Sequence, residues 1–386
     1  MSNIQKNNKP NVPNLRFPEF SGEWEKRKLA SIGKFFSGGT PTSSNKDYYD
    51  GEIPFIRSGE IHSDHTELSI SAIGYENSSA KMVSKGDLLL ALYGATSGDI
   101  AISRMSGAIN QAILCIRTTQ DHLFLKSVWE KHVKNILNTY LQGGQGNLSA
   151  DIVKNLFFYF PRIEEQRKIG RLIELIDQRI AIQNRAIEQY ESLIKGIVDI
   201  TILGKEKNAN IGDICSISKQ IKVEANLNDI ISVRLHGKGV CKSCAENLQI
   251  GSTQYYRRRT GQLIYGKQNF HNGAIGIVPE SLDNGITSKD IPSFDIDRLK
   301  CNSLYLLAQL QSPQYYRQAE ALTTGTGSKR LKEETFLKMP IVLPDKEEQD
   351  NIASLVSCVM TKLDLARRLL ALFSCQKNYL LDQLFV

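Results

Sequence analysis

The second half of the chain contains a short run in which tyrosines stand beside arginines. The run is 253-TQYYRRRTG-261, and its chemistry lies in Tyr255, Tyr256, Arg257, Arg258 and Arg259. A tyrosine ring can stack on a base, while a guanidinium fork fits a phosphate or the edge of a guanine. The run therefore predicts contact with a nucleic acid. A solvated basic strand that protects a sheet edge is the alternative interpretation.

Two further groups of polar residues flank this run. The segment 259-RTGQLIYGKQNFHNGAIGIV-278 reads as strand, Gly-rich turn and strand, so side chains in its turn could reach a groove of DNA. A second polar segment, 233-VRLHGKGV-240, stands at the position equivalent to Arg57 and Ser58 in the first half. The candidate contacts in these two segments are Lys267, Asn269 and His271, and Arg234, His236 and Lys238.

The first half of the chain repeats this arrangement with different side chains. The segment 84-SKGDLLLALYGATSGDIAI-102 has the same pattern, and its turn is small and hydroxylic. Arg57 and Ser58 stand at the position that Arg234 occupies in the second half. The candidate contacts of the first half are Arg57, Ser58, Lys81, Tyr93, Thr96 and Ser97. A structural role is the alternative for each of them.

Two Gly-rich loops, 143-GGQGN-147 and 325-GTGSKR-330, are further candidates. Bare backbone N–H groups there could approach the phosphates of DNA. Lys329 and Arg330 add positive charge in the second loop. A plain turn between a helix and a strand is the alternative for both loops.

The sequence offers no recognisable catalytic or metal site. It contains no G-x-x-x-x-G-K-[ST], G-x-G-x-x-G, H-E-x-x-H or G-x-S-x-G motif. Cys241 and Cys244 have the C-x-x-C spacing, but a zinc site needs four ligands and no second pair follows. We therefore expect no catalysis by this chain and no bound metal.

These candidate contacts lie within an internal repeat. The stretch 160-FPRIEEQRKIGRLI-173 returns as 343-LPDKEEQDNIASLV-356, at an offset of 183 residues. The strand–turn–strand segments match at an offset of 175, which indicates an insertion or deletion between related but diverged parts. Such a repeat determines the architecture. It predicts the order globular part, helix, globular part, helix.

The helices are predicted from an apolar pattern that follows each proline. Apolar residues recur at alternating steps of four and three over four to five heptads, in register in both copies, which predicts two long helices that pack together. The predicted pairing residues are Ile169, Ile173, Ile176, Ile180, Ile187, Ile352, Val356, Val359, Leu363 and Leu370. Asp345 stands where it would cap the second helix. Two independent helices, each packed on its own globular part, are the alternative.

Composition limits the class of protein. A chain of 386 residues with 41% hydrophobic and 23% charged residues is typical of a globular protein of two or three domains. No apolar run predicts a membrane span, and MSNIQKNNKPNVPN lacks the apolar core of a secretory signal. Seven scattered cysteines then indicate reduced thiols in a cytoplasmic protein. The net charge of +7 is compatible with a polyanionic partner.

Taken in order, these motifs resemble the specificity subunit of type I restriction-modification systems. The resemblance rests on the opening LRFPEFSGEWEKRKLASIGKFFSGGTP, the IRSGEI segment, the LYGATSGDIAI hairpin and the duplicated Gly-loop, proline, EEQ and long-helix cassette. Each motif alone is weak. Their order and duplication over nearly the whole chain are specific.

The resemblance implies an α+β fold. It contains two target recognition domains of mixed strand and helix structure, each followed by a long helix, and the two helices pair as an antiparallel coiled coil with pseudo-twofold symmetry. We predict a flexible arm at residues 1–14, recognition domains at 15–160 and 204–343, and spacer helices at 161–203 and 344–386.

The resemblance also implies a function without catalysis. Each domain would read one half of an asymmetric, bipartite site in double-stranded DNA, and the helices would dock two methyltransferase subunits. S-adenosylmethionine, ATP and magnesium would be bound by those modification subunits and by restriction/translocase subunits, in a complex that methylates DNA and defends the cell against foreign DNA. A coiled-coil scaffold for proteins and a cryptic DNA-modifying enzyme are the alternatives.

Overall fold

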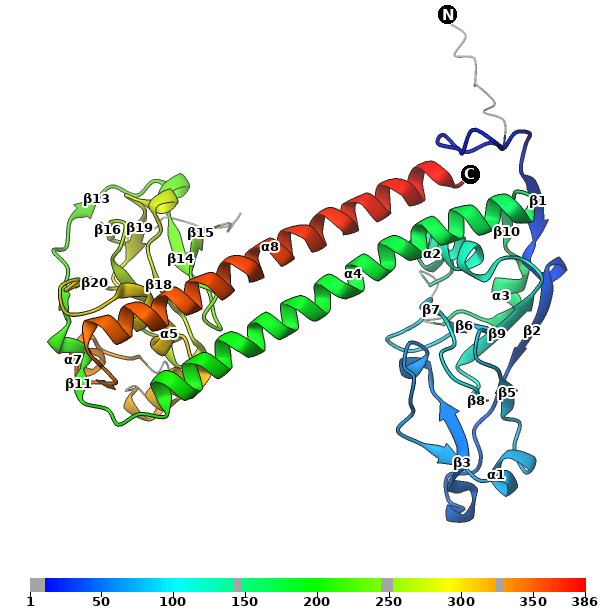
Figure 1. Ribbon diagram of the computed structural model, residues 1–386, viewed down its shortest axis with the longest axis horizontal. Helices are drawn as coiled ribbons and strands as arrows, with labels where there is room; N and C mark the ends of the chain where they lie inside the picture. Colours follow the sequence, from blue (N-terminus) through cyan, green and yellow to red (C-terminus); the bar gives the residue numbers. More distant parts are fainter. Residues whose placement is uncertain (1–10, 142–146, 244–252, 324–329) are drawn as a thin grey trace, which may run out of the picture. The chain divides into compact units, whose positions relative to one another are not determined.

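The computed structural model describes residues 11–141, 147–243, 253–323 and 330–386 (Figure 1). The chain forms two compact units, the first made of residues 1–183 and 369–386 and the second of residues 184–368. Helices α4 (Ile163–Val198) and α8 (Lys346–Leu384) each run from one unit into the other. Each unit therefore holds a globular part, the start of one long helix and the end of the other.

The globular part of the first unit is built on two four-stranded sheets. One sheet has the order β2 (Gly33–Ser37), β9 (Ile113–Thr118), β6 (Leu88–Ala91) and β7 (Ile100–Ile102), and the other has the order β4 (Ser69–Ile70), β3 (Tyr49–Ile56), β8 (Gly107–Ile109) and β5 (Lys81–Val83). Strand β6 is buried on both faces, since Leu88 and Leu90 enter one apolar cluster while Leu89 and Ala91 enter another. Alternate residues of a strand point to opposite faces, so its four apolar residues fit this central position.

The second unit repeats the first of these sheets with shorter strands. Its order is β12 (Cys215–Ile217), β20 (Ser293–Ile296), β17 (Leu263–Tyr265) and β18 (Ile275–Ile277). Leu263 lies opposite Ile277 as Leu88 lies opposite Ile102, at the offset of 175 residues. The two expected strand–turn–strand segments are therefore hairpins, and they occupy the same place in both sheets.

Smaller elements complete each unit. In the first unit β1 (Glu25–Lys28) pairs with β10 (Phe157–Phe160), and the helices are α1 (Ala72–Glu76), α2 (His122–Leu141) and α3 (Ala150–Asn155). In the second unit β11 (Ala209–Asn210) pairs with β21 (Pro340–Ile341), β14 (Ile231–Val233) pairs with β15 (Val240–Lys242), and a sheet has the order β13 (Lys222–Val223), β16 (Tyr255–Arg257) and β19 (Ile286–Ser288). Its helices are α5 (Ser303–Leu310), α6 (Pro313–Tyr316) and α7 (Glu333–Leu337).

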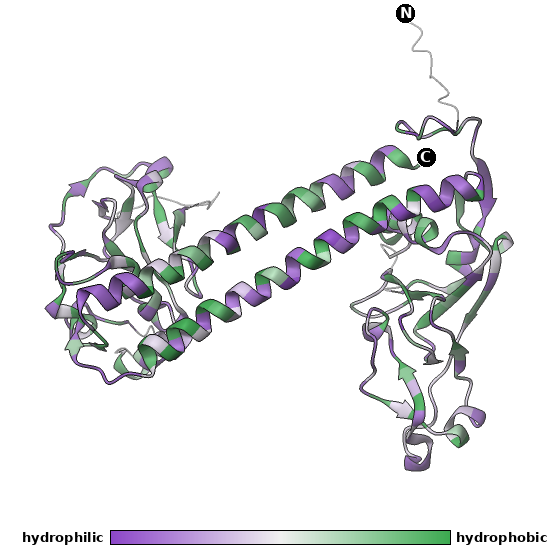
Figure 2. Cartoon of the chain, viewed as in Figure 1, coloured by the Kyte–Doolittle hydropathy of each residue, from purple (hydrophilic) through white to green (hydrophobic). Residues whose placement is uncertain are grey.

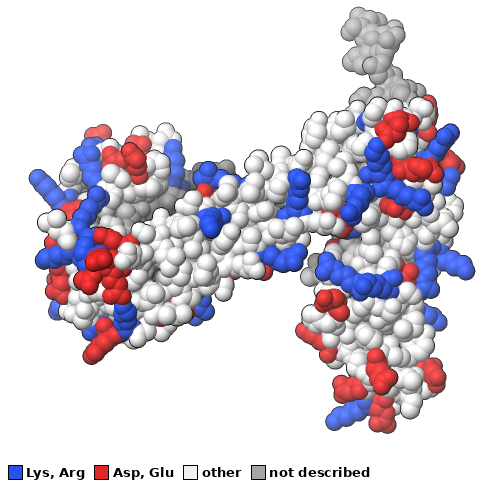
Figure 3. Space-filling view, in the orientation of Figure 1, with Lys and Arg blue, Asp and Glu red and all other residues white. Residues whose placement is uncertain are grey.

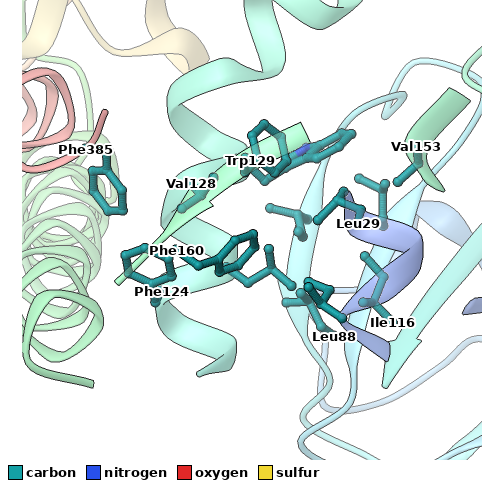
Figure 4. Close-up of a cluster of buried hydrophobic side chains, with 14 of the residues drawn as sticks. Leu29, Leu88, Ile116, Phe124, Val128, Trp129, Val153, Phe160 and Phe385 are labelled. Atoms are coloured by element: carbon teal, nitrogen blue, oxygen red, sulfur yellow. The ribbon is translucent and has the colours of Figure 1, made fainter. Parts of the chain in front are cut away.

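The end of α8 and the residue that follows it complete the core of the first unit. The ring of Phe385 lies 5.4 Å from that of Phe124, between centroids, with Phe160 close by (Figure 4). Ile169 and Ile173, at the start of α4, enter the same cluster. The globular core, the start of α4 and the end of α8 thus form one apolar cluster.

The second unit joins the opposite ends of the helices. Ile197 and Val198 of α4 pack with Val356 and Val359 of α8 in one buried cluster. Because starts meet ends in both units, the helices are antiparallel, and the apolar residues that the sequence indicated recur along both of them (Figure 2). This confirms the predicted α+β fold with paired long helices. Asp345 caps α8 by accepting a hydrogen bond from the Glu348 N–H at 2.8 Å.

Most of the predicted pairing residues are buried. Ile169, Ile173, Ile176, Ile352, Val356, Val359 and Leu363 are buried, while Ile180, Ile187 and Leu370 are half-buried. The pattern is not wholly apolar, since Lys377 also falls on it. In the first unit Lys377 and Lys126 form a ring of ion pairs with Glu130 and Asp177, with N···O distances of 2.6–2.9 Å and side chains 15–23% exposed.

The repeated glutamine of the EEQ motif explains why the motif occurs twice. The Gln166 side chain donates to the carbonyl oxygen of Pro161 at 2.9 Å and accepts from the Asp121 N–H at 3.2 Å. Gln349 donates in the same way to Pro344 at 2.9 Å and accepts from the Asn302 N–H at 2.8 Å. Both glutamines are 1% exposed. Each ties the proline before a long helix to the start of an earlier helix, which is α2 in the first unit and α5 in the second.

Replacing Gln349 with alanine is expected to lower the free energy of unfolding of the second unit by about 1–3 kcal/mol, because buried backbone groups lose their partners. Chemical denaturation of the full chain with its partner subunits would measure the loss. Gln376→Ala, at an exposed site on α8, is the matched control and should change stability by less than about 0.5 kcal/mol. Equal effects of the two variants would contradict the role of the buried amide.

Candidate nucleic-acid interface

In each unit a loop that follows a strand outside the repeated four-stranded sheet lies against the hairpin of that sheet. In the second unit the loop after β14 donates from the His236 N–H to the Asn272 carbonyl at 2.7 Å, and from the Gly237 N–H to the Gly273 carbonyl at 2.9 Å. In the first unit His62, in the loop after β3, contacts Asp99 of the hairpin at 2.9 Å. The fold therefore brings together the two segments in which the sequence placed polar candidates.

The loop side chains of the second unit point to solvent. Arg234, His236 and Lys238 are exposed, and within the described part of the chain their side chains make no ion pair or hydrogen bond. Two of the three are cations at neutral pH, available to a polyanion.

The corresponding arginine of the first unit is already paired. Arg57 contacts Glu60 at 3.1 Å and Glu67 at 2.5 Å. Hydrogen bonds from these two carboxylates raise the pKa of Arg57 above its usual value. Ser58, beside it, is half-buried. Arg57 thus stabilises its own loop, and its charge is largely neutralised there.

One arginine of the Tyr–Arg run is buried, contrary to the prediction that it contacts a nucleic acid. Arg258 is 0% exposed and donates to the hydroxyls of Thr287 at 2.7 Å and Ser293 at 2.9 Å, to the Gln220 side chain at 3.1 Å and to the Ile291 carbonyl at 2.9 Å. Burial lowers its pKa to about 10, so it remains a cation at neutral pH. Arg258 links Thr287 of β19 to Ser293 of β20, which belong to different sheets, and its buried side chain is not available to DNA.

The neighbours of Arg258 differ in exposure. Tyr255 is 5% exposed and belongs to a small apolar cluster, so its ring is not available for stacking, which is a second correction. Tyr256 is half-buried, and Arg257 lines a polar depression of about 600 Å³ next to Asp283. Arg259 is exposed, with Asp283 at 3.9 Å. Only Tyr256, Arg257 and Arg259 remain candidates.

The polar candidates in and near the hairpin of the second unit make contacts within the protein. The Asn272 side chain contacts Asn269 at 3.4 Å and His271 at 3.2 Å. Lys267 is 12% exposed and pairs with Glu333 at 2.8 Å, which makes it a structural residue rather than a free contact. Asn269 is exposed and His271 is half-buried. Arg330 is exposed but contacts Asp290 at 3.2 Å. Lys329 lies outside the described residues.

The hairpin of the first unit uses its hydroxyls internally. Tyr93 donates to the Gln111 carbonyl at 2.6 Å, and Ser97 donates to the Leu92 carbonyl at 2.9 Å. Thr96 is half-buried, and Lys81 is exposed on β5. The hydroxyls of Tyr93 and Ser97 therefore stabilise the turn by internal hydrogen bonds.

Two residues near these surfaces were missed from the sequence. Thr40 donates to the Gln111 side-chain oxygen at 2.7 Å, across 71 positions of the chain, so no local pattern indicated the contact. Lys289 is exposed and helps Lys267 to lower the pKa of Glu333. An isolated lysine carries no recognisable motif.

Charge is mixed rather than gathered in one patch on the visible face. Figure 3 shows Lys and Arg interspersed with Asp and Glu over both units.

Among the described residues no group of three or more His, Cys, Asp or Glu could hold a metal ion. Cys241 is half-buried beside Ser232, at 3.6 Å, whereas Cys244 lies outside the described part.

Most of the chain matches a known family. The model of the type I restriction modification DNA specificity domain matches residues 21–192 and 206–372. The chain belongs to this family. It is a DNA specificity subunit of a type I restriction-modification system, with two target recognition domains and no catalysis of its own, and it acts in a complex with other subunits and DNA. The cofactors of such a complex belong to the other subunits.

Relatives and solved structures agree with this assignment. The type I restriction enzyme MjaVIII specificity subunit of Methanocaldococcus jannaschii is 18% identical over 389 residues, which cover 92% of this chain and 89% of that protein. The EcoR124I/EcoR124II specificity subunit of Escherichia coli is 24% identical over 204 residues, 47% of this chain and 50% of its own length.

Of the described helices, none is long and apolar enough to cross a bilayer.

Solved structures show the same fold. The S subunit of a type I restriction-modification system from M. genitalium matches with a TM-score of 0.66 at 14% identity, covering 97% of this chain and 99% of that one. A chain from a structural study of complex assembly and conformational transition of the type I system matches with a TM-score of 0.51 at 15% identity, covering 94% and 97%.

Proposed function

We propose that each target recognition domain reads one half of an asymmetric, bipartite site in double-stranded DNA. The observation that carries this proposal is a repeated scaffold with unlike loops. The two hairpins have the same strand register, and Gln166 and Gln349 make equivalent hydrogen bonds. In contrast, Arg57 contacts carboxylates, whereas Arg234 is exposed to solvent. Two copies of one scaffold with different surface chemistry suit two different half-sites.

The proposed division of labour follows the chain. Residues 15–160 and 204–343 are the two readers, and residues 161–203 and 344–386 are the helices that separate them. An arm is predicted at residues 1–14, of which residues 1–10 lie outside the described part of the chain. We infer that the complex works in the cytoplasm, where its DNA lies.

The long helices are the proposed docking surface for two methyltransferase subunits. Several large apolar side chains on them are exposed by 43–65%, which favours burial against a partner. They are Leu175, Ile182 and Leu193 on α4, and Leu355, Leu365, Leu372 and Tyr379 on α8. S-adenosylmethionine would then be bound by the methyltransferase subunits, and ATP with magnesium by restriction/translocase subunits that join them.

Methylation sequencing tests the function directly. The chain is co-expressed with the methyltransferase subunit encoded beside its gene, and methylated adenines in the host DNA are mapped. We expect one motif made of two short, different half-sites with a fixed gap. A palindromic motif, or a stable complex that methylates DNA without sequence preference, would contradict the proposal.

Single-domain variants sharpen this test. Asn269→Ala, in the hairpin of the second unit, is expected to relax one half-site and leave the other unchanged, because a lost base contact costs about 1–3 kcal/mol at that position alone. Thr96→Ala, in the matching hairpin, is the counterpart and should affect only the other half-site. Changes in both halves from either variant would show that the domains do not read independently.

A further inference from the structure

The loops after β3 and β14 occupy corresponding places but differ in charge. Strand β3 pairs in parallel with β8, and Ile230, next to β14, makes a parallel bridge to Ile286 of β19. Arg57 directly follows β3, and Arg234 directly follows β14. Glu60, which pairs with Arg57, corresponds to Gly237, and residues 231–243 contain no Asp or Glu. The second loop therefore keeps its positive charge.

The second loop is also rigid. The Arg234 N–H donates to the Gly239 carbonyl at 2.9 Å, which closes the loop, and the two bonds to Asn272 and Gly273 fix it on the hairpin. His236 has a φ of 59°, in the left-handed region that a residue with a side chain seldom adopts. Such strain persists only where surrounding contacts enforce it, and it is common at binding sites. The backbone of the loop is thus fixed, while the side chains of Arg234, His236 and Lys238 stay exposed.

The charge of the whole domains follows the same division. Residues 204–343 contain 19 Lys and Arg against 13 Asp and Glu, a net charge of +6, whereas residues 15–160 contain 15 of each. The arginines of the first domain are also mostly paired, including Arg16 with Glu165 and Arg117 with Asp87. A neutral domain gains little from the phosphates of DNA, while a cationic one gains much.

We propose that the second recognition domain is the electrostatic anchor of the complex on DNA, and that Arg234 and Lys238 of its rigid loop bind backbone phosphates. The first domain contributes sequence reading with little phosphate affinity. The proposal rests on the proposed function and deepens it, because it names how the two domains divide the binding. Phosphates are proposed as their ligands because the net positive charge of the domain attracts the backbone of any DNA sequence, and the loop offers two exposed cations.

Salt dependence tests the proposal in the assembled complex with its methyltransferase subunits. Binding to a duplex with the methylated motif, and to a duplex with that motif scrambled, is measured between 50 and 200 mM salt. For the double variant Arg234→Gln with Lys238→Gln, the slope of log K against log salt is expected to fall in magnitude by about two, roughly one for each lost phosphate contact. Affinity should weaken for both duplexes alike.

The matched control removes the same charge from the first domain. Lys81 and Lys85 are exposed and form no ion pair within the described residues, so Lys81→Gln with Lys85→Gln should change the slope by less than half as much. Equal changes would overturn the anchor proposal. A loss confined to the methylated motif with an unchanged slope would also overturn it, because the loop would then read bases. If the unaltered complex did not distinguish the two duplexes, the proposed function itself would fail.

Discussion

Replacing Arg258 with methionine is expected to lower the free energy of unfolding of the second unit by roughly 3 kcal/mol. The guanidinium is fully buried and serves four acceptors, all of them neutral. Methionine fills a similar length but donates nothing, so buried oxygens of Thr287, Ser293 and Ile291 lose a partner. Each unsatisfied buried group costs about 1–3 kcal/mol, and local rotation of the hydroxyls recovers part of the loss.

Hydrogen exchange in the assembled complex would measure this effect. Amides of β16, β19 and β20 should exchange roughly a hundredfold faster in Arg258→Met, since each 1.4 kcal/mol corresponds to about a factor of ten. Arg259→Met is the control, because Arg259 is exposed next in the chain and should leave exchange within about threefold. Arg258→Lys should recover little, because one ammonium cannot reach four separated acceptors. Unchanged exchange in Arg258→Met would refute the structural role.

Features that depend on patterns of neighbouring residues could be predicted from the sequence. Contacts between residues far apart in the chain could not. Hairpins at 88–102 and 263–277 and the long helices follow from patterns of neighbouring residues, and the structure contains both. The Arg triplet was different. Neighbouring strand residues alternate between faces, but the pattern does not say which face is interior. That depends on Thr287 and Ser293, which lie 29 and 35 positions away.

The same limit applies to the other candidates. Lys267 looked like a free cation because its partner Glu333 stands far along the chain, and Arg57 looked like its counterpart Arg234 because the sequence did not reveal that Glu60 folds back. Charge at a candidate position is therefore predictable from sequence, whereas its availability is not.

Replacing Lys377 with isoleucine is expected to destabilise the first unit by roughly 2–4 kcal/mol at neutral pH. In the ring of ion pairs, Asp177 and Glu130 would then share Lys126 alone while largely shielded from water. Removing one partner from a poorly solvated ion pair costs several kcal/mol, because the remaining charge stays buried. Thermal or chemical denaturation of the full chain with its partners would show the loss, and Lys362→Ile, at an exposed site on α8, is the control.

The chain itself supplies a rescue variant. At the offset of 183 residues, Ile194 corresponds to Lys377 and Met360 to Asp177, so the second unit has apolar residues at both places. Ile194 there packs beside Val356 and Val359. Lys377→Ile combined with Asp177→Met should therefore recover most of the stability that Lys377→Ile loses, since only the Lys126–Glu130 pair remains. Additive losses in the double variant would mean that the two residues do not act as a pair.

The pH dependence of the Lys377→Ile effect gives an independent check. Burial tends to raise the pKa of Asp177, but Lys126 and Lys377 lower it below its usual value. This contribution to stability is present above the unfolded pKa of about 3.9 and is lost as the pH falls through the lowered folded value. Without Lys377, one of the two lysines that lower the pKa of Asp177 is lost, so burial raises this pKa. A proton can then neutralise the Asp177 carboxylate in the folded state. The destabilisation should thus be smaller at pH 4.5 than at pH 7.5. A loss that is equal at both pH values would assign the effect of the substitution to packing rather than to charge.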